Sequence, residues 1–161
     1  MKKLFLALLA LCFLSQFAGV ASACLCRPDA PRKAFNRARK VASVVFSGRV
    51  LQVVNGNETG EFRGWRATFQ VTRYWKGAPS DEVVVFTGPD DCAAYFEQGQ
   101  EYLVFAYVPK GERELSTSNC MRTGPVRLKA EYLAWLGRGK ISRKRPEDQS
   151  SSGKLVIGGT P

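Results

Sequence analysis

The chain has 161 residues, with 24 lysines and arginines, 14 aspartates and glutamates and no histidine, so its formal net charge at pH 7 is +10. The length favours one domain, and the lack of histidine excludes Ser-His-Asp and Cys-His catalysis and the common histidine-ligated zinc sites. Asp90 and Asp91 are adjacent in a Gly-Pro turn context, where acidic residues usually only solvate a loop. We therefore do not expect an enzyme.

The first 23 residues are typical of a signal peptide. Two lysines precede an apolar run over residues 4–14, and small residues follow it. The run is too short for a comfortable membrane span, and no later stretch reaches about 18 apolar residues, so no transmembrane segment is expected. Cleavage after Ala23 would export a chain that begins at Cys24, to a secreted, periplasmic or extracellular location. A lipid anchor on Cys24 is the less favoured alternative, because Ala21 stands where bacterial lipoprotein signals prefer leucine.

Four cysteines would remain in the exported chain: Cys24, Cys26, Cys92 and Cys120. An exported context favours disulfides over thiolate metal ligands. Four cysteines allow three pairings, and Cys24 and Cys26 are too close to bridge each other comfortably. Each is therefore expected to reach a distant partner, and the spacing leaves open which one.

A short amphipathic helix is expected over residues 29–41. Asp29 would be its cap and Pro31 would lie in its first turn. Apolar residues recur at helical spacing and predict one packed face, formed by Ala34, Phe35, Ala38 and Val41.

Extended segments dominate the middle of the chain. The clearest pattern starts at Trp65, where apolar residues at alternate positions as far as Val71 predict a strand with one buried face. A polar loop over 55–64 separates this strand from an earlier β-branched run, and the two should pair as antiparallel strands. With the turn signals between them, the five extended segments predict a mostly β fold that closes into a small barrel. The other four cover residues 43–54, 82–86, 101–108 and about 114–118.

A second helix is expected over residues 125–137, with Gly137 as its stop. Its packed side would be formed by Leu128, Tyr132, Leu133 and Leu136. Residues 138–161 are first basic and then rich in serine and glycine, which predicts a disordered tail. The exported chain would carry 22 basic and 14 acidic residues, a net charge of +8 that favours anionic surfaces. A solvated basic tail accounts for much of this charge, so a dedicated polyanion site is not predicted.

Three features resemble one family: Cys-x-Cys directly after a signal peptide, the aromatic-Lys-Gly turn at residues 75–77, and the cysteine spacing. Over roughly residues 24–137 the chain is similar to the netrin-like (NTR) amino-terminal domain of the tissue inhibitors of metalloproteinases (TIMPs). Besides these features, the resemblance rests on the stretches CLCRPDAPRKAFNRARKVASVVFSGRV, TFQVTRYWKG and STSNC. The resemblance implies a five-stranded barrel of the oligonucleotide/oligosaccharide-binding (OB) type and the disulfides Cys24–Cys92 and Cys26–Cys120. The short basic leader and the missing carboxy-terminal subdomain of the animal proteins favour a bacterial member.

The resemblance also implies an inhibitor of zinc metalloendopeptidases. In that family the free amine and the carbonyl of the first residue, here Cys24, chelate the catalytic zinc of the target and displace its water. The zinc belongs to the protease, so no cofactor of the chain itself is expected. Leu25 would enter the pocket beside the zinc. It replaces the small hydroxyl residue of the animal inhibitors, which implies a different or deeper pocket. The residues facing the protease would be Cys24, Leu25, Cys26, Arg27, Pro28, Asp90 and Asp91.

A different class of function is the main alternative. Netrin-like domains also occur as non-inhibitory modules, here one for a protein or glycan in the cell envelope, and the fold alone does not decide between the two. In that case Cys-x-Cys would serve only as a staple, and Leu25 would only cover the barrel. Export argues against single-stranded nucleic acid as a partner, in spite of aromatic residues such as Trp65 and Trp75.

Overall fold

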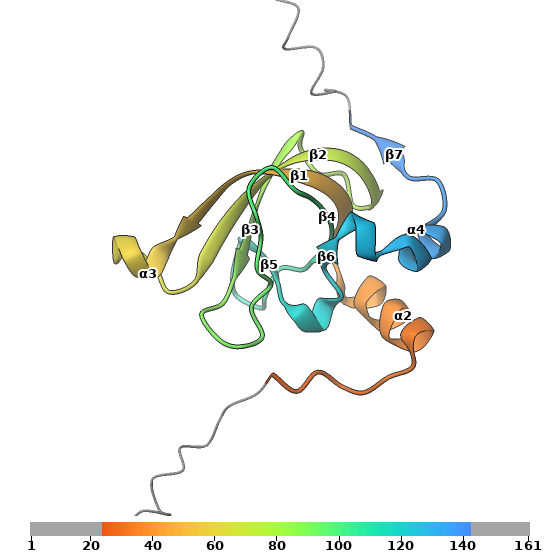
Figure 1. The fold of residues 1–161 in the computed structure, drawn as a ribbon, viewed down its shortest axis with the longest axis horizontal. Helices are drawn as coiled ribbons and strands as arrows, with labels where there is room; N and C mark the ends of the chain where they lie inside the picture. Colours follow the sequence, from red (N-terminus) through yellow and green to blue (C-terminus); the bar gives the residue numbers. More distant parts are fainter. Residues whose placement is uncertain (1–23, 143–161) are drawn as a thin grey trace, which may run out of the picture.

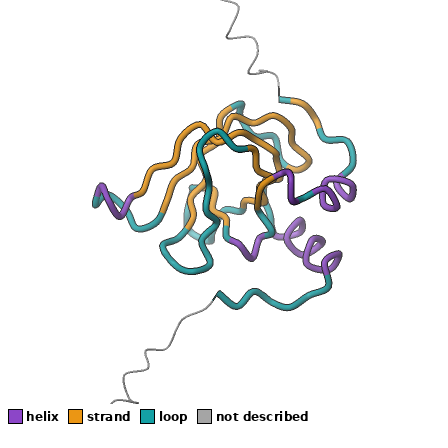
Figure 2. The backbone as a smooth tube through the Cα atoms, viewed as in Figure 1, coloured by secondary structure: helices purple, strands orange, loops and turns teal. Residues whose placement is uncertain are grey.

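The computed structural model describes residues 24–142, so the expected signal peptide over 1–23 and the tail residues 143–161 lie outside the described part. The fold is mostly β, as predicted, and its sheet curls into a half-barrel with two helices, α2 and α4, on one side (Figures 1 and 2). Within residues 24–142, every helix falls short of the length and apolar character of a membrane span. In chain order the elements are α2 (Pro31–Val41), β1 (Val44–Asn55), α3 (Gly56–Thr59), β2 (Trp65–Lys76), β3 (Glu82–Thr87), β4 (Glu101–Ala106), β5 (Leu115–Thr117), a 3-10 helix (Asn119–Met121), β6 (Gly124–Pro125), a second 3-10 helix (Val126–Leu128), α4 (Ala130–Leu136) and β7 (Lys140–Ile141).

The strands follow the order β5–β3–β2–β1–β4–β6, and β7 pairs with β2 outside this path. All pairs are antiparallel except β3 with β5, which is parallel. Three register shifts interrupt the β1–β2 ribbon between Val45 and Gln52. Such bulges bend a strand and increase its twist, so they help to curl the sheet. Gly48 is needed here, because a Cβ at this position would lie 2.7 Å from the backbone oxygen of Gln70.

The concave side of the sheet holds one part of the core. Ala67, Phe69 and Val71 are fully buried, which confirms the alternation predicted for β2, while Trp65 at the strand's start is only half-buried. Phe69 packs edge-on against Phe46 of β1, with ring centroids 5.5 Å apart. Burial of apolar surface on this scale is the main force that holds the strands in register.

The two helices form the other part of the core. Phe35 of α2 is 1% exposed and packs against Phe105 of β4 and against Tyr132 and Trp135 of α4, with ring centroids 5.2 to 6.0 Å apart. Ala34 and Ala38 are buried beside Phe35, as the helical spacing predicts. Val41 was expected on the same face, but it is 53% exposed because the helix ends there and the chain turns into β1.

A bidentate ion pair ties β2 to the segment that leads into β5. Arg66 Nε lies 2.6 Å from Glu114 Oε1, and a second guanidinium nitrogen lies 3.1 Å from Glu114 Oε2. These hydrogen bonds to Glu114 raise the pKa of Arg66 above its ordinary value. Near this edge, Tyr107 and Ser116 exchange two backbone hydrogen bonds, of 2.9 and 2.7 Å.

Several local predictions differ from the structure. The residue at the amino-terminal boundary of α2 is Ala30, without a side-chain cap, so the prediction of Asp29 as the cap is wrong. The expected helix over 125–137 is broken at Lys129, whose dihedral angles (φ −119°, ψ 22°) are not helical, and Leu128 is 67% exposed instead of packed. Gly137 does end α4, with a positive φ of 69°.

Besides the 3-10 helix at Asn119–Met121, short elements were not predicted at three places. A single helical turn, α3, lies in the loop expected over 55–64, and β6 lies where no strand was expected. The third is β7, in residues assigned to the start of the tail, where Lys140 and Ile141 pair with Tyr74 and Arg73 of β2. Elements of two to four residues have no periodicity of their own, because their tertiary partners determine them.

Candidate functional site

The amino-terminal segment of the described chain is held by two disulfides. Cys24 bonds to Cys92, in the loop after β3, and Cys26 bonds to Cys120, in the 3-10 helix after β5, with S–S distances of 2.05 and 2.03 Å. These are the two pairs that the family resemblance implies. The two partner loops are themselves connected, because the Asn119 N–H donates to the Cys92 carbonyl at 2.8 Å. The segment is therefore attached to two loops that are hydrogen-bonded to each other.

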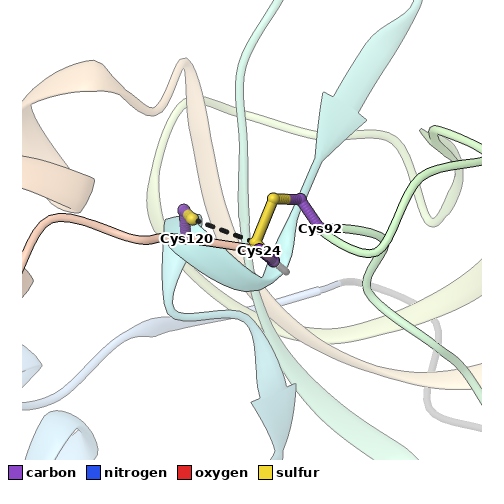
Figure 3. A group of neighbouring side chains, drawn as sticks. All are labelled: Cys24, Cys92 and Cys120. Atoms are coloured by element: carbon purple, nitrogen blue, oxygen red, sulfur yellow. Dashed lines mark hydrogen bonds between the residues drawn. A yellow bond between two sulfur atoms is a disulfide. The ribbon is translucent and has the colours of Figure 1, made fainter. Parts of the chain in front are cut away.

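The two disulfides also touch each other. The Sγ atom of Cys24 lies 3.7 Å from Sγ of Cys120 and 3.9 Å from Sγ of Cys26, and Figure 3 shows the first of these contacts as a dashed line beside the Cys24–Cys92 bond. The sulfur atoms of Cys24, Cys92 and Cys120 all lie within 4.8 Å of one another, which is close enough for metal ligands. Since all of them are in disulfides, they offer no thiolate to a metal ion.

Leu25 projects into solvent between the two bridged cysteines. Its exposed fraction is 92%, although the residues on either side are half-buried and covalently fixed. The interpretation in which Leu25 only covers the sheet is therefore wrong. Arg27 and Pro28 continue the segment and are also exposed. Other large apolar side chains of the described residues are exposed as well, among them Leu128 and Ile141. Leu25 differs from them because both of its neighbours in the chain are disulfide-bonded.

Asp90 and Asp91 directly precede Cys92, which is bonded to Cys24, so they lie next to this segment. The Asp90 carboxylate accepts a hydrogen bond of 3.0 Å from the Cys92 N–H, and the Asp90 carbonyl accepts one of 2.9 Å from the Ala93 N–H. Asp90 therefore shapes the turn that presents the disulfide partner of Cys24. Both aspartates are exposed, so they add negative charge to the surface close to the Cys24–Cys92 bridge.

Asp29 has a structural role that the sequence reasoning missed. Its side chain is only 6% exposed and is surrounded by cations: it pairs with Arg37, and its Oδ1 atom lies 3.7 Å from Arg27 Nε and 3.8 Å from Lys33 Nζ. These contacts tie the segment after Cys26 to the first two turns of α2. The recurrence of Asp29, Lys33 and Arg37 at intervals of four residues is a signal in the sequence that could have revealed it.

The chemistry available at this site is that of a main-chain and apolar contact surface. The site thus combines a constrained backbone, one exposed leucine and nearby charges of both signs. A search with models of known protein families finds no match to the chain, and a search of curated proteins finds none either.

Proposed function

We propose that the chain is an exported, TIMP-like inhibitor of zinc metalloendopeptidases that acts through its amino-terminal segment. Leu25 carries this proposal: it is 92% exposed between two cysteines that are bonded to two different loops. A residue fixed in this way loses little ordering entropy when it enters a pocket, which favours tight binding. The proposal requires that residues 1–23 are removed and that the amine of Cys24 stays unmodified.

The chelation step follows from the chemistry of a first residue. The amine and the carbonyl oxygen of Cys24 belong to one residue, so together they can close a five-membered ring on a metal ion. A catalytic zinc keeps one coordination position for the water that attacks the peptide bond. Chelation would displace this water and leave no nucleophile. An α-amine titrates near pH 7.7 to 8.0 in model peptides, so a useful neutral fraction exists at physiological pH.

We also propose that the sheet closes into a five-stranded barrel of the OB type. Three observations support this: the strand order, the parallel pairing of β3 with β5, and the two backbone hydrogen bonds between Tyr107 and Ser116, which would join the edge of β4 to β5. A closed barrel leaves no exposed sheet edge and gives the amino-terminal segment a stiff base.

The decisive experiment blocks the α-amine of Cys24. The exported chain is purified, its first residue and mass are determined, and its inhibition of a panel of zinc endopeptidases is measured before and after acetylation of the α-amine, or after extension by one alanine. Inhibition should be lost in both forms while the near-UV circular dichroism and the unfolding midpoint stay the same. Acetylation also modifies lysines, so the alanine extension serves as the selective form.

The same experiment separates the two classes of function. Unaltered potency after alanine extension would eliminate chelation by Cys24. A mature chain that starts at another residue, or that carries a lipid on the Cys24 nitrogen, would do the same. A chain that inhibits no member of the panel would favour the non-inhibitory netrin-like module, which does not need a free amine.

A further inference from the structure

A pocket lies between the sheet and α4. Its volume is about 450 Å³, which is in the range of binding sites for small molecules. Residues of β1, β2 and β4 form one wall, residues of α4 and of the second 3-10 helix form another, and β7 and Ser142 complete the lining. No residue of 24–28 or 90–92 lines this pocket, so it is separate from the candidate site at Cys24.

One side of the pocket is apolar. Trp75, Val126 and Leu133 are partly buried against the part of the core that the helices form, and they also line the pocket. The Trp75 indole N–H donates to the Gly137 carbonyl at 2.8 Å, so the ring is held in place and its polar group already has a partner. Ile141, which is 63% exposed, adds to this surface. Covering the surface with an apolar group of a ligand would be favourable.

The polar side of the pocket contains a chain of hydrogen bonds that ends at a carboxylate. Ser47 Oγ lies 2.9 Å from Thr72 Oγ1, and Thr72 Oγ1 lies 2.8 Å from Glu101 Oε1 and 3.0 Å from the Ser47 carbonyl oxygen. The Thr72 hydroxyl has one proton, and the charged carboxylate is the stronger of its two acceptors. Ser47 then donates to Thr72 and Thr72 donates to Glu101, so the carboxylate is held at the pocket.

Two opposite charges that line the pocket have no charged partner among the described residues. Within residues 24–142, neither Glu101 nor Arg73 forms an ion pair, with the other or with any third residue. The stem of Arg73 is packed tightly, because a Cβ at Gly139 would lie 2.6 Å from Arg73 Cγ and 2.9 Å from its Cδ. The pocket therefore offers one anion, one cation and an apolar surface.

We propose that this pocket binds a free α-amino acid with an apolar side chain. The ammonium group of such a ligand would donate to the Glu101 carboxylate, and its carboxylate would accept from the Arg73 guanidinium. Its side chain would lie against Trp75, Val126 and Leu133. An apolar amine would leave Arg73 without a partner, and an apolar acid would leave Glu101 without one. A zwitterion is the class of ligand that satisfies both charges.

The proposal is tested by NMR titration of the purified, disulfide-bonded, isotopically labelled chain with L-phenylalanine and three analogues. Phenethylamine lacks the carboxylate, 3-phenylpropionate lacks the ammonium group, and glycine lacks the side chain. Each analogue should bind about 10- to 100-fold more weakly than L-phenylalanine, because it loses a charge-assisted hydrogen bond or the burial of the phenyl ring. An analogue that binds as tightly as L-phenylalanine would overturn the proposal, and so would a lack of binding by L-phenylalanine.

Two variants test the two charged contacts separately. Glu101→Gln should weaken binding of L-phenylalanine about 10- to 100-fold without weakening binding of 3-phenylpropionate, which has no ammonium group. Arg73→Gln should weaken L-phenylalanine in the same way without weakening phenethylamine, which has no carboxylate. The matched controls Glu112→Gln and Arg113→Gln remove the same charges from exposed positions outside the pocket and should change no affinity. Equal losses in the pocket variants and the controls would overturn the proposal.

The same titration of the parent chain shows where the ligand binds and does not depend on the folding of any variant. L-phenylalanine should shift the amide resonances of residues 72–75 and 137–142 and leave those of residues 24–28 and 90–92 unchanged. Shifts confined to any other part of the chain would overturn the proposal. Glu101→Gln and Arg73→Gln should inhibit proteases as the parent chain does, so this proposal and the function proposed for Cys24 can fail independently.

Discussion

Individual side chains differ most directly in how much of their surface the fold buries. Leu25 is the clearest case, because its large apolar side chain is 92% exposed. We predict that Leu25→Ala leaves the free energy of unfolding unchanged but weakens inhibition of a sensitive protease about 10- to 100-fold, because burying a leucine side chain contributes about 1.5 to 3 kcal/mol. Inhibition constants and urea unfolding measure the two effects.

The matched control for Leu25 is Leu128→Ala, which removes another exposed leucine, 67% exposed, from a different surface. It should change neither quantity. Equal potency of Leu25→Ala and the parent chain would exclude a pocket for this residue. A large loss of stability in Leu25→Ala would show that the residue has a structural role.

Lys129 is a half-buried lysine whose Nζ atom lies 5.1 Å from the centre of the Tyr132 ring. Burial lowers its pKa below the ordinary value of 10.5, and the nearby charge of Arg122 lowers it further. In the unfolded chain the amine keeps the ordinary value, so between the lowered pKa and 10.5 the folded state loses its proton first. The contribution of Lys129 to stability therefore rises with pH through this window, and below it the cost of the buried charge is constant.

The corresponding prediction is that Lys129→Met is more stable than the parent chain at pH 7, and that this advantage shrinks as the pH approaches 10.5. Urea unfolding at both pH values measures it, and Lys110→Met, at an exposed position, corrects for the general effect of removing a lysine. An advantage that is the same at both pH values would contradict the assignment to Lys129.

Among the elements, α2 depends on the carboxylate that precedes it. Asp29 is nearly buried among Arg27, Lys33 and Arg37, and Asn would keep its shape while removing its charge. We predict that Asp29→Asn lowers the free energy of unfolding by about 1 to 3 kcal/mol, because a partly buried guanidinium loses its charged partner. Asp91→Asn, at an exposed position, should change it by less than about 0.5 kcal/mol. Similar unfolding midpoints for the two variants in urea would contradict this role of Asp29.

For the chain taken together, the disulfides are the long-range restraints. They span sequence separations of 68 and 94 residues, and closing loops of this size contributes up to about 4 to 5 kcal/mol each in the loop-entropy model. We predict that the double variant Cys26→Ala with Cys120→Ala lowers the free energy of unfolding by about 2 to 5 kcal/mol. It should also inhibit a sensitive protease more weakly than the parent chain, because residues 25–28 lose one of their two anchors. Urea unfolding and inhibition constants test this. Unchanged inhibition by the folded variant would show that one anchor is sufficient.

Local patterns were sufficient to predict much of the architecture. Three of the confirmed patterns depend only on neighbours within a few residues. They are the alternation that ends in Phe69 and Val71, the helical spacing of Ala34, Phe35 and Ala38, and the end of a helix at Gly137. Such signals are present in any isolated stretch, because the period of apolar residues has to match the period of the backbone. The lack of histidine likewise excluded whole classes of catalytic site from composition alone.

The sequence by itself therefore determined the five predicted strands and the principal helix face, and its lack of histidine excluded catalytic sites that need that residue. Only the tertiary structure decided that Leu25 stays in solvent and that Asp29 serves as an ion-pair centre instead of a cap. It also decided that Thr72 of β2, Glu101 of β4 and Leu133 of α4 line one pocket. The physical reason is separation along the sequence. Burial and charge pairing depend on contacts between residues that are tens of positions apart, and a local pattern of apolar residues does not predict which distant residues come into contact.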